Sequence, residues 1–174
     1  MIADAGKAAA VLFLAVIVQV SILSNVDIVH GRPKLILVAV VAVALLRGAV
    51  FGAVAGFGAG FLADTGTFGM LGFTSLLLTL AGYWAGRYGE TTGRDRAHAP
   101  VLSVAVVAAL YQFSALILHF MLGQPAPARE VLLIGLAPTV LLNVLLTFPV
   151  YALVQRLLPP HGWAERAREV RLLG

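Results

Sequence analysis

Four glycines lie four residues apart near the middle of the chain, and they limit how it can fold. They are Gly48, Gly52, Gly56 and Gly60, and we call them the glycine ladder. A spacing of four places them on one face of an α-helix. In water, each glycine would destabilise that helix by about 1 kcal/mol relative to alanine. In a lipid bilayer, small residues instead let two helix backbones approach closely, and this contact drives helix association. The ladder therefore predicts a membrane protein with a closely packed helix over these residues.

The composition agrees with a membrane protein. Hydrophobic residues make up 60% of the chain and charged residues 11%, whereas a soluble domain has about 25% charged residues. The mean hydropathy is +0.97. The chain has no cysteine, which excludes disulfides, zinc–cysteine sites and iron–sulfur clusters. Its 174 residues are enough for one membrane domain and short connections.

The net charge of +4 does not indicate a nucleic-acid partner. The basic residues lie singly at the ends of apolar segments, without a basic stripe interleaved with aromatic residues. Basic residues in such places are typical of the cytoplasmic ends of membrane helices. We therefore predict that the chain is embedded in membrane lipid and binds no nucleic acid.

Six apolar runs are separated by polar residues, glycine or proline. They cover residues 8–24, 34–46, 49–63, 68–86, 101–122 and 131–158. The second and third runs are short against a hydrocarbon core of about 30 Å, so one long helix interrupted by Arg47 is an alternative. Six spans with the N-terminus inside place nine of the 12 Lys and Arg residues in the cytoplasm, as the positive-inside rule requires. If the second and third runs formed one helix, most of the basic residues would lie outside, against the positive-inside rule.

We therefore predict an all-α integral membrane protein with six transmembrane helices and with both the N- and C-termini in the cytoplasm. Residues 1–158 form the six-helix transmembrane domain, and residues 159–174 form a basic cytoplasmic tail. The first run is longer than the apolar part of a signal peptide and lacks a convincing cleavage site, so we interpret it as an uncleaved span. The tail fits either a segment lying on the anionic inner leaflet or a solvated end.

The glycine ladder leaves two interpretations open. The glycines can contact another helix of the same chain, or they can receive a helix from a partner protein, since both contacts depend on the same close approach. Arg47 marks a tight turn at the cytoplasmic boundary. Asp64 is either a functional carboxylate within the membrane or a residue that ends the helix and forms the turn over residues 64–66. Arg47 and Asp64 are thus the candidate functional polar residues.

The sequence offers no site for catalysis, a cofactor or a metal. Gly58, Gly60 and Ala63 resemble a dinucleotide-binding motif, but that motif needs a preceding strand, and here the residues lie inside an apolar helix. No pair of carboxylates has a spacing that suits acid–base chemistry. His119 is a single histidine, and we predict that it binds no metal. We predict a protein that is not an enzyme and has no cofactor.

The order of these segments resembles the MreD family of bacterial rod shape-determining membrane proteins. The resemblance covers most of residues 8–158 and is sharpest over residues 33–87. A short second helix runs from Pro33 to Arg47, and the glycine-rich third helix ends near Asp64. The remaining motif residues are glycines and an arginine that follow in the next turn and the fourth helix: Gly69, Gly72, Gly82, Gly86 and Arg87.

The resemblance implies a non-enzymatic scaffold in the bacterial inner membrane. MreD-like proteins act with MreC, MreB, RodA and a class B penicillin-binding protein in lateral peptidoglycan synthesis. On this interpretation the face from Gly48 to Gly60 holds the single span of an MreC-like partner, and a homodimer is an open alternative. The family is also similar in fold to the substrate-binding S-components of energy-coupling-factor transporters. This similarity supplies the alternative function, a subunit of a vitamin uptake transporter.

Overall fold

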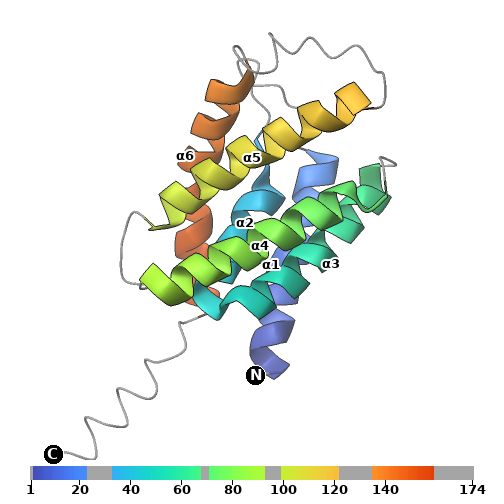
Figure 1. Cartoon of the computed structure of the whole chain (residues 1–174). Helices are drawn as coiled ribbons and strands as arrows, with labels where there is room; N and C mark the ends of the chain where they lie inside the picture. Colours follow the sequence, from blue (N-terminus) through green and yellow to red (C-terminus); the bar gives the residue numbers. More distant parts are fainter. Residues whose placement is uncertain (1, 23–32, 68–70, 93–98, 122–134, 159–174) are drawn as a thin grey trace, which may run out of the picture.

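The computed structural model describes residues 2–22, 33–67, 71–92, 99–121 and 135–158. These residues form six α-helices and no strand (Figure 1). The helices are α1 (Ile2–Ser21), α2 (Leu35–Arg47), α3 (Ala49–Thr67), α4 (Phe73–Thr92), α5 (Ala99–Met121) and α6 (Leu136–Leu157). The all-α class predicted from the sequence is confirmed.

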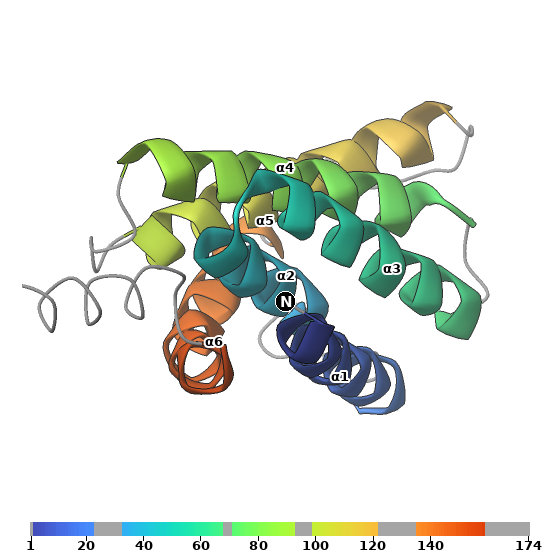
Figure 2. The same cartoon turned by 90° about the horizontal axis from the view of Figure 1, so that it is seen from below.

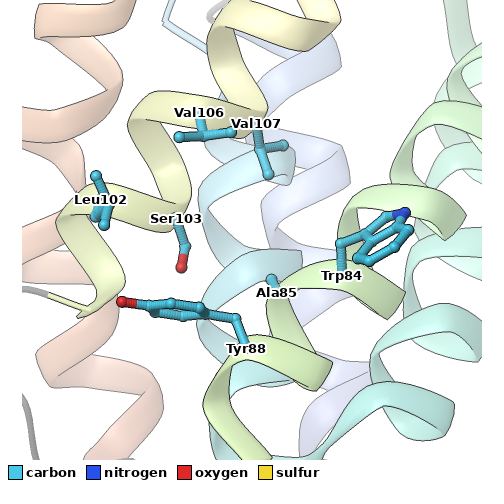
Figure 3. A pocket seen from close by; sticks show the side chains of 7 residues that line it. All are labelled: Trp84, Ala85, Tyr88, Leu102, Ser103, Val106 and Val107. Carbon is cyan, nitrogen blue, oxygen red and sulfur yellow. The ribbon is translucent and has the colours of Figure 1, made fainter. Parts of the chain in front are cut away.

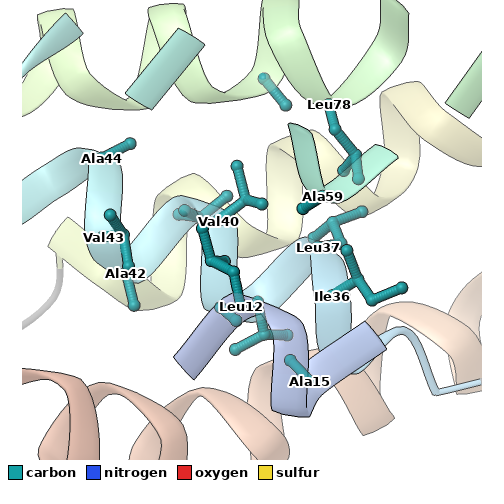
Figure 4. Close-up of a cluster of buried hydrophobic side chains, with 14 of the residues drawn as sticks. Leu12, Ala15, Ile36, Leu37, Val40, Ala42, Val43, Ala44, Ala59 and Leu78 are labelled. Carbon is teal, nitrogen blue, oxygen red and sulfur yellow. The ribbon is translucent and has the colours of Figure 1, made fainter. Parts of the chain in front are cut away.

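The short helix α2 forms the centre of the bundle. Eleven of its 13 residues are buried, and it packs against each of the other five helices. Figure 2 shows it between α1 and α6 on one side and the α3–α4 pair on the other. In Figure 4, Leu12 and Ala15 of α1, Ala59 of α3 and Leu78 of α4 surround it. A helix that is apolar on all sides is typical of a protein core or of a membrane interior.

The outer helices expose large apolar side chains. Phe13 of α1, Val50 and Phe57 of α3, Phe113 of α5 and Leu145 of α6 are all exposed. Soluble monomers rarely expose contiguous apolar patches larger than a few hundred Å², whereas lipid is a suitable solvent for such a surface. By length and composition alone, α6 and residues 49–66 of α3 could each cross a membrane.

The second and third apolar runs form two helices, so the alternative of one fused helix is wrong. Gly48 separates them with a φ of 99°, a conformation that glycine adopts without steric cost. Its N–H donates to the carbonyl oxygen of Ala44 at 2.8 Å and closes the last turn of α2. Arg47 is the last residue of α2, where its positive charge faces the negative end of the helix dipole.

The connection between α3 and α4 differs from the predicted turn. The third apolar run ended at Ala63, and one interpretation of Asp64 placed a turn over residues 64–66, but α3 continues to Thr67. The Asp64 side chain instead accepts hydrogen bonds from Thr74 and Ser75 in the first turn of α4. Pro149 lies inside α6. The tail of residues 159–174 and His119's side chain lie outside the part that the structure describes.

Candidate functional site: the seam between α3 and α4

The closest helix contact in the described structure joins α3 to α4. A Cβ atom added to Gly52 would lie 2.5 Å from both the Cβ of Ala44 and the carbonyl oxygen of Gly82. A Cβ on Gly56 would overlap the Leu78 carbonyl group, and one on Gly60 would overlap the Ser75 backbone. Real Cβ atoms do not approach other atoms so closely, so three ladder positions leave no room for a side chain.

Helix α4 contributes glycines of its own to this contact. A Cβ on Gly82 would overlap the Gly52 carbonyl group, and one on Gly86 would lie 2.5 Å from the Gly48 carbonyl oxygen. The two helices therefore run antiparallel, with backbone against backbone. We call this contact, formed by the glycine ladder together with Gly82 and Gly86, the glycine seam.

Asp64 lies at one end of the seam, where it caps the N-terminus of α4. It is 2% exposed. Its Oδ2 accepts hydrogen bonds from the Gly72 N–H at 2.9 Å and the Ser75 N–H at 3.2 Å, and its Oδ1 accepts one from the Thr74 N–H at 3.2 Å. The first N–H groups of a helix have no partner within the helix, and they form the positive end of its dipole. A carboxylate supplied by α3 thus satisfies two of them, at Thr74 and Ser75, and also the N–H of Gly72 just before the helix.

Glu90 performs the same task at the other end. Its Oε1 accepts a hydrogen bond from the Ala49 N–H at 2.8 Å, at the first residue of α3. Its Oε2 lies 3.4 Å from Nη1 of Arg87 in an exposed ion pair. Each helix of the α3–α4 pair therefore caps the N-terminus of the other with a carboxylate, and we call this arrangement reciprocal capping.

The N-terminus of α2 is capped by two other helices. The Leu35 N–H donates to Oε1 of Gln19 in α1 at 2.6 Å, and the Lys34 N–H donates to Oδ1 of Asn143 in α6 at 2.7 Å. Nε2 of Gln19 also donates to the Pro33 carbonyl oxygen at 3.2 Å. Side chains of α1 and α6 therefore satisfy backbone groups at the start of α2.

The family model described as rod shape-determining protein MreD matches residues 8–159. This chain belongs to the MreD family. The resemblance predicted from the sequence is confirmed. No curated protein and no solved structure matches the chain, and the predicted likeness to S-components remains untested.

Membership in the MreD family gives the chain a role in determining rod shape. MreD proteins are bacterial membrane proteins of the MreBCD system. Membership therefore implies that the chain contacts the membrane and other proteins. They are structural proteins rather than known enzymes. In the part of the chain that the structure describes, no three His, Cys, Asp or Glu residues gather into a metal-binding group.

A second polar cluster of this MreD-family chain lies beside the start of α2. The Nζ of Lys34 is 3.2 Å from the centroid of the Tyr111 ring in α5, a cation–π contact. The Tyr111 hydroxyl lies 3.4 Å from Oγ1 of Thr74, whose N–H donates to Asp64. The cluster thus links α2, α5 and the capped start of α4.

The structure separates the two candidate polar residues. Asp64 is at the α4 N-terminal end of the seam, whereas Arg47 ends α2 next to Gly48, at the Glu90 end. The cap formed by Glu90 was not predicted from the sequence. The signal was present as spacing, because Asp64 follows Gly60 by four residues and Glu90 follows Gly86 by four. Each series of small residues ends with a carboxylate on the same helix face.

Proposed function

We propose that this MreD-family chain is a non-enzymatic scaffold of the cell-wall elongation complex in the bacterial cytoplasmic membrane. It holds the membrane span of an MreC-like protein. Through that protein it associates with RodA, a class B penicillin-binding protein and MreB, and so supports lateral peptidoglycan synthesis. The observation that carries this proposal is the match of the family model to residues 8–159.

The proposed topology has six spans with both termini in the cytoplasm. Residues 1–158 form the membrane domain, and residues 159–174 form a cytoplasmic tail. Support comes from the placement of nine of the 12 basic residues on one side. In Figure 1 the start of α1, the junction of α2 with α3 and the end of α6 lie toward the same end of the bundle, which agrees with this topology.

Labelling with an impermeant thiol reagent tests the topology without a cysteine-free variant, because the chain has no cysteine. Thr92→Cys should react only after the inner membrane is opened, whereas Gln124→Cys should react in intact cells with a permeable outer layer. Labelling of Thr92→Cys from outside would contradict the six-span proposal.

In this proposal the glycine ladder packs helices of the same chain together and does not dock the partner. Since its glycines face α4 and α2, we propose that the seam maintains the shape of the bundle and that the partner's span contacts the lipid-facing surface. Gly58 provides a matched position on the same helix, because nothing lies within 4 Å of a Cβ built there.

Co-purification with the MreC-like partner tests the scaffold. Gly56→Ala should lower the amount of folded protein, while the partner recovered per folded molecule stays unchanged. Deletion of residues 161–174 should leave both quantities intact. If the wild-type chain recovers no MreC-like protein, and if its loss leaves rod-shaped cells unchanged, the proposed function is wrong. If Gly56→Ala accumulates normally but no longer recovers the partner, the ladder is a docking face for the partner and not an internal contact.

A further inference from the structure

A groove lies between α4 and α5, on the side of α4 that faces away from the seam (Figure 3). Its volume is about 250 Å³. The lining is almost entirely apolar and consists mainly of Trp84 and Tyr88 of α4 and of Leu102, Val106 and Val107 of α5. Such a lining does not select one hydrocarbon chain over another. A place with more chemical definition lies at the opposite end of the bundle, where α2 begins.

An amide donor is buried at the start of α2. The Asn143 side chain of α6 is 0% exposed, and its Oδ1 accepts the hydrogen bond from the Lys34 N–H at 2.7 Å. Within the part of the chain that the structure describes, its Nδ2 has no hydrogen-bond partner. A buried donor without an acceptor is costly, and such groups are rare in native proteins. The Nδ2 group therefore points to an acceptor that is not one of the described residues.

The same place is positively charged. Lys34 directly precedes α2, and its Nζ lies 3.2 Å from the centroid of the Tyr111 ring. The first turn of α2 adds the positive end of its helix dipole. Because the lysine stem is short, the ammonium stays near the amide that caps its own backbone N–H. Lys34 and Tyr111 are both half-buried, so the described residues do not seal this place.

We propose that the start of α2 binds a small carboxylate, which accepts a hydrogen bond from Nδ2 of Asn143 and pairs with the Lys34 ammonium. Helix N-termini with convergent donors are suitable sites for anions. This inference goes beyond the scaffold function and does not depend on it.

The local charge fits an anion with a single negative charge. The other described Lys and Arg residues lie 12 or 13 positions along their helices from Gln19, Lys34, Thr74 or Asn143, which is about 18–20 Å. They are Lys7, Arg47, Arg87 and Arg156. Lys34 is thus the single basic residue of the described chain at this end, and a doubly charged phosphate would be only half neutralised.

The cap of α2 alone does not account for an amide at residue 143. The cap uses only Oδ1, and a carboxylate or a hydroxyl accepts such a bond equally well. The carboxylate of Asp64, which Thr74 links to Tyr111, is engaged by three N–H groups at the start of α4. The donor of Asn143 therefore remains for an external acceptor.

Nuclear magnetic resonance of the Asn143 side chain tests the proposal directly. The chain has two asparagines, so Asn25→Ser leaves Asn143 as the single reporter in full-length protein labelled with amide-¹⁵N asparagine. Sodium acetate is added to the protein in detergent, against sodium chloride at the same ionic strength. Acetate should shift the Nδ2 signals in a saturable manner and raise the midpoint of thermal unfolding, whereas chloride should do neither.

Two variants and one control locate the acetate site by the rise in the unfolding midpoint. Asn143→Asp keeps the acceptor for the Lys34 N–H but replaces the donor with a negative charge, so it should fold and lose the response to acetate. Lys34→Gln should weaken the response several-fold. Lys7→Gln removes a lysine at the other end of α1 and should leave the response unchanged.

Three results would overturn the proposal. If acetate leaves the Asn143 signals unshifted, or if chloride shifts them equally, no carboxylate binds at this amide. If Asn143→Asp and Lys34→Gln retain the full response, acetate binds elsewhere. If inorganic phosphate produces a larger saturable shift than acetate, the site is not selective for a carboxylate. A saturable shift with acetate that both variants lose would support the site.

Discussion

The two faces of α4 differ in how closely another helix approaches. On one face Gly82 and Gly86 let the backbone of α3 come into direct contact. On the other face Trp84 and Tyr88 stand between α4 and α5, and a groove of about 250 Å³ remains. Both faces are apolar, so hydrophobicity does not distinguish them. In a membrane, side-chain size decides which helices touch, because lipid is as apolar as the helix surface.

The largest effect should come from filling the seam. Gly56→Ala places a Cβ on the Leu78 carbonyl group, and overpacking of this kind typically costs about 1–3 kcal/mol. We expect a clear loss of monodisperse protein and a lower midpoint of thermal unfolding in detergent, both measured by fluorescence-detected gel filtration.

Gly58→Ala is the matched control for that change. It lies on the same helix, two residues away, with open space around its Cβ. Alanine favours helix by about 1 kcal/mol over glycine, so this variant should be neutral or slightly more stable. Equal stability of Gly56→Ala and Gly58→Ala would mean that α3 and α4 do not touch along the seam.

Removal of the Asp64 cap should have the next largest effect. Asp64→Ala leaves the N–H groups of Gly72, Thr74 and Ser75 without their acceptor, and unsatisfied buried groups cost about 1–3 kcal/mol. Asp64→Asn keeps one acceptor oxygen, so its stability should lie between that of the wild type and that of Asp64→Ala. The unfolding midpoint in detergent measures this order, and an unchanged midpoint for Asp64→Ala would show that the cap is not formed.

Glu90→Ala should be milder, because Glu90 lies at the surface, where water can replace its carboxylate as the acceptor for the Ala49 N–H. Loss of an N-terminal cap typically costs about 1 kcal/mol. Glu90→Gln keeps the acceptor and should recover most of the stability. Arg87→Gln is the control for the ion pair, since exposed pairs contribute about 0–1 kcal/mol. A larger loss for Arg87→Gln than for Glu90→Ala would contradict the proposed cap.

The smallest effect should come from the groove face. Val106→Phe adds volume where space exists, and surface substitutions away from special features usually change stability by no more than about 0.5 kcal/mol. The unfolding midpoint should therefore match that of the wild type. A destabilisation as large as that of Gly56→Ala would remove the contrast between the two faces of α4.

The sequence predicted the six helices and the close contact, but not the partners in that contact. Apolar runs and glycine spacing are local patterns, so they identified a small-residue face on residues 48–60. Which helix meets that face is a property of the whole bundle. Asp64 was similarly ambiguous, because a carboxylate at a helix end suits a ligand, a turn or a neighbouring helix. The hydrogen bonds that Asp64 accepts at the start of α4 depend on where α4 lies, which the local sequence does not give.

The groove could not be predicted at all. Trp84 and Tyr88 on one helix and Leu102 and Val106 on another are ordinary apolar residues in the sequence. The space between them depends on how far α4 and α5 stand apart in the folded bundle. A feature defined by missing contacts has no signature in a single sequence.

Reciprocal capping also bears on the order in which the chain assembles during synthesis. The polar ends of α3 and α4 are satisfied by Asp64 and Glu90, so this hairpin is complete as soon as residue 92 has been made. The start of α2 instead needs Asn143 from the last helix. The central helix is therefore made early but reaches its final contacts last. A membrane chaperone or insertase that shields the start of α2 until α6 arrives would protect a backbone N–H whose acceptor, Asn143, has not yet been made.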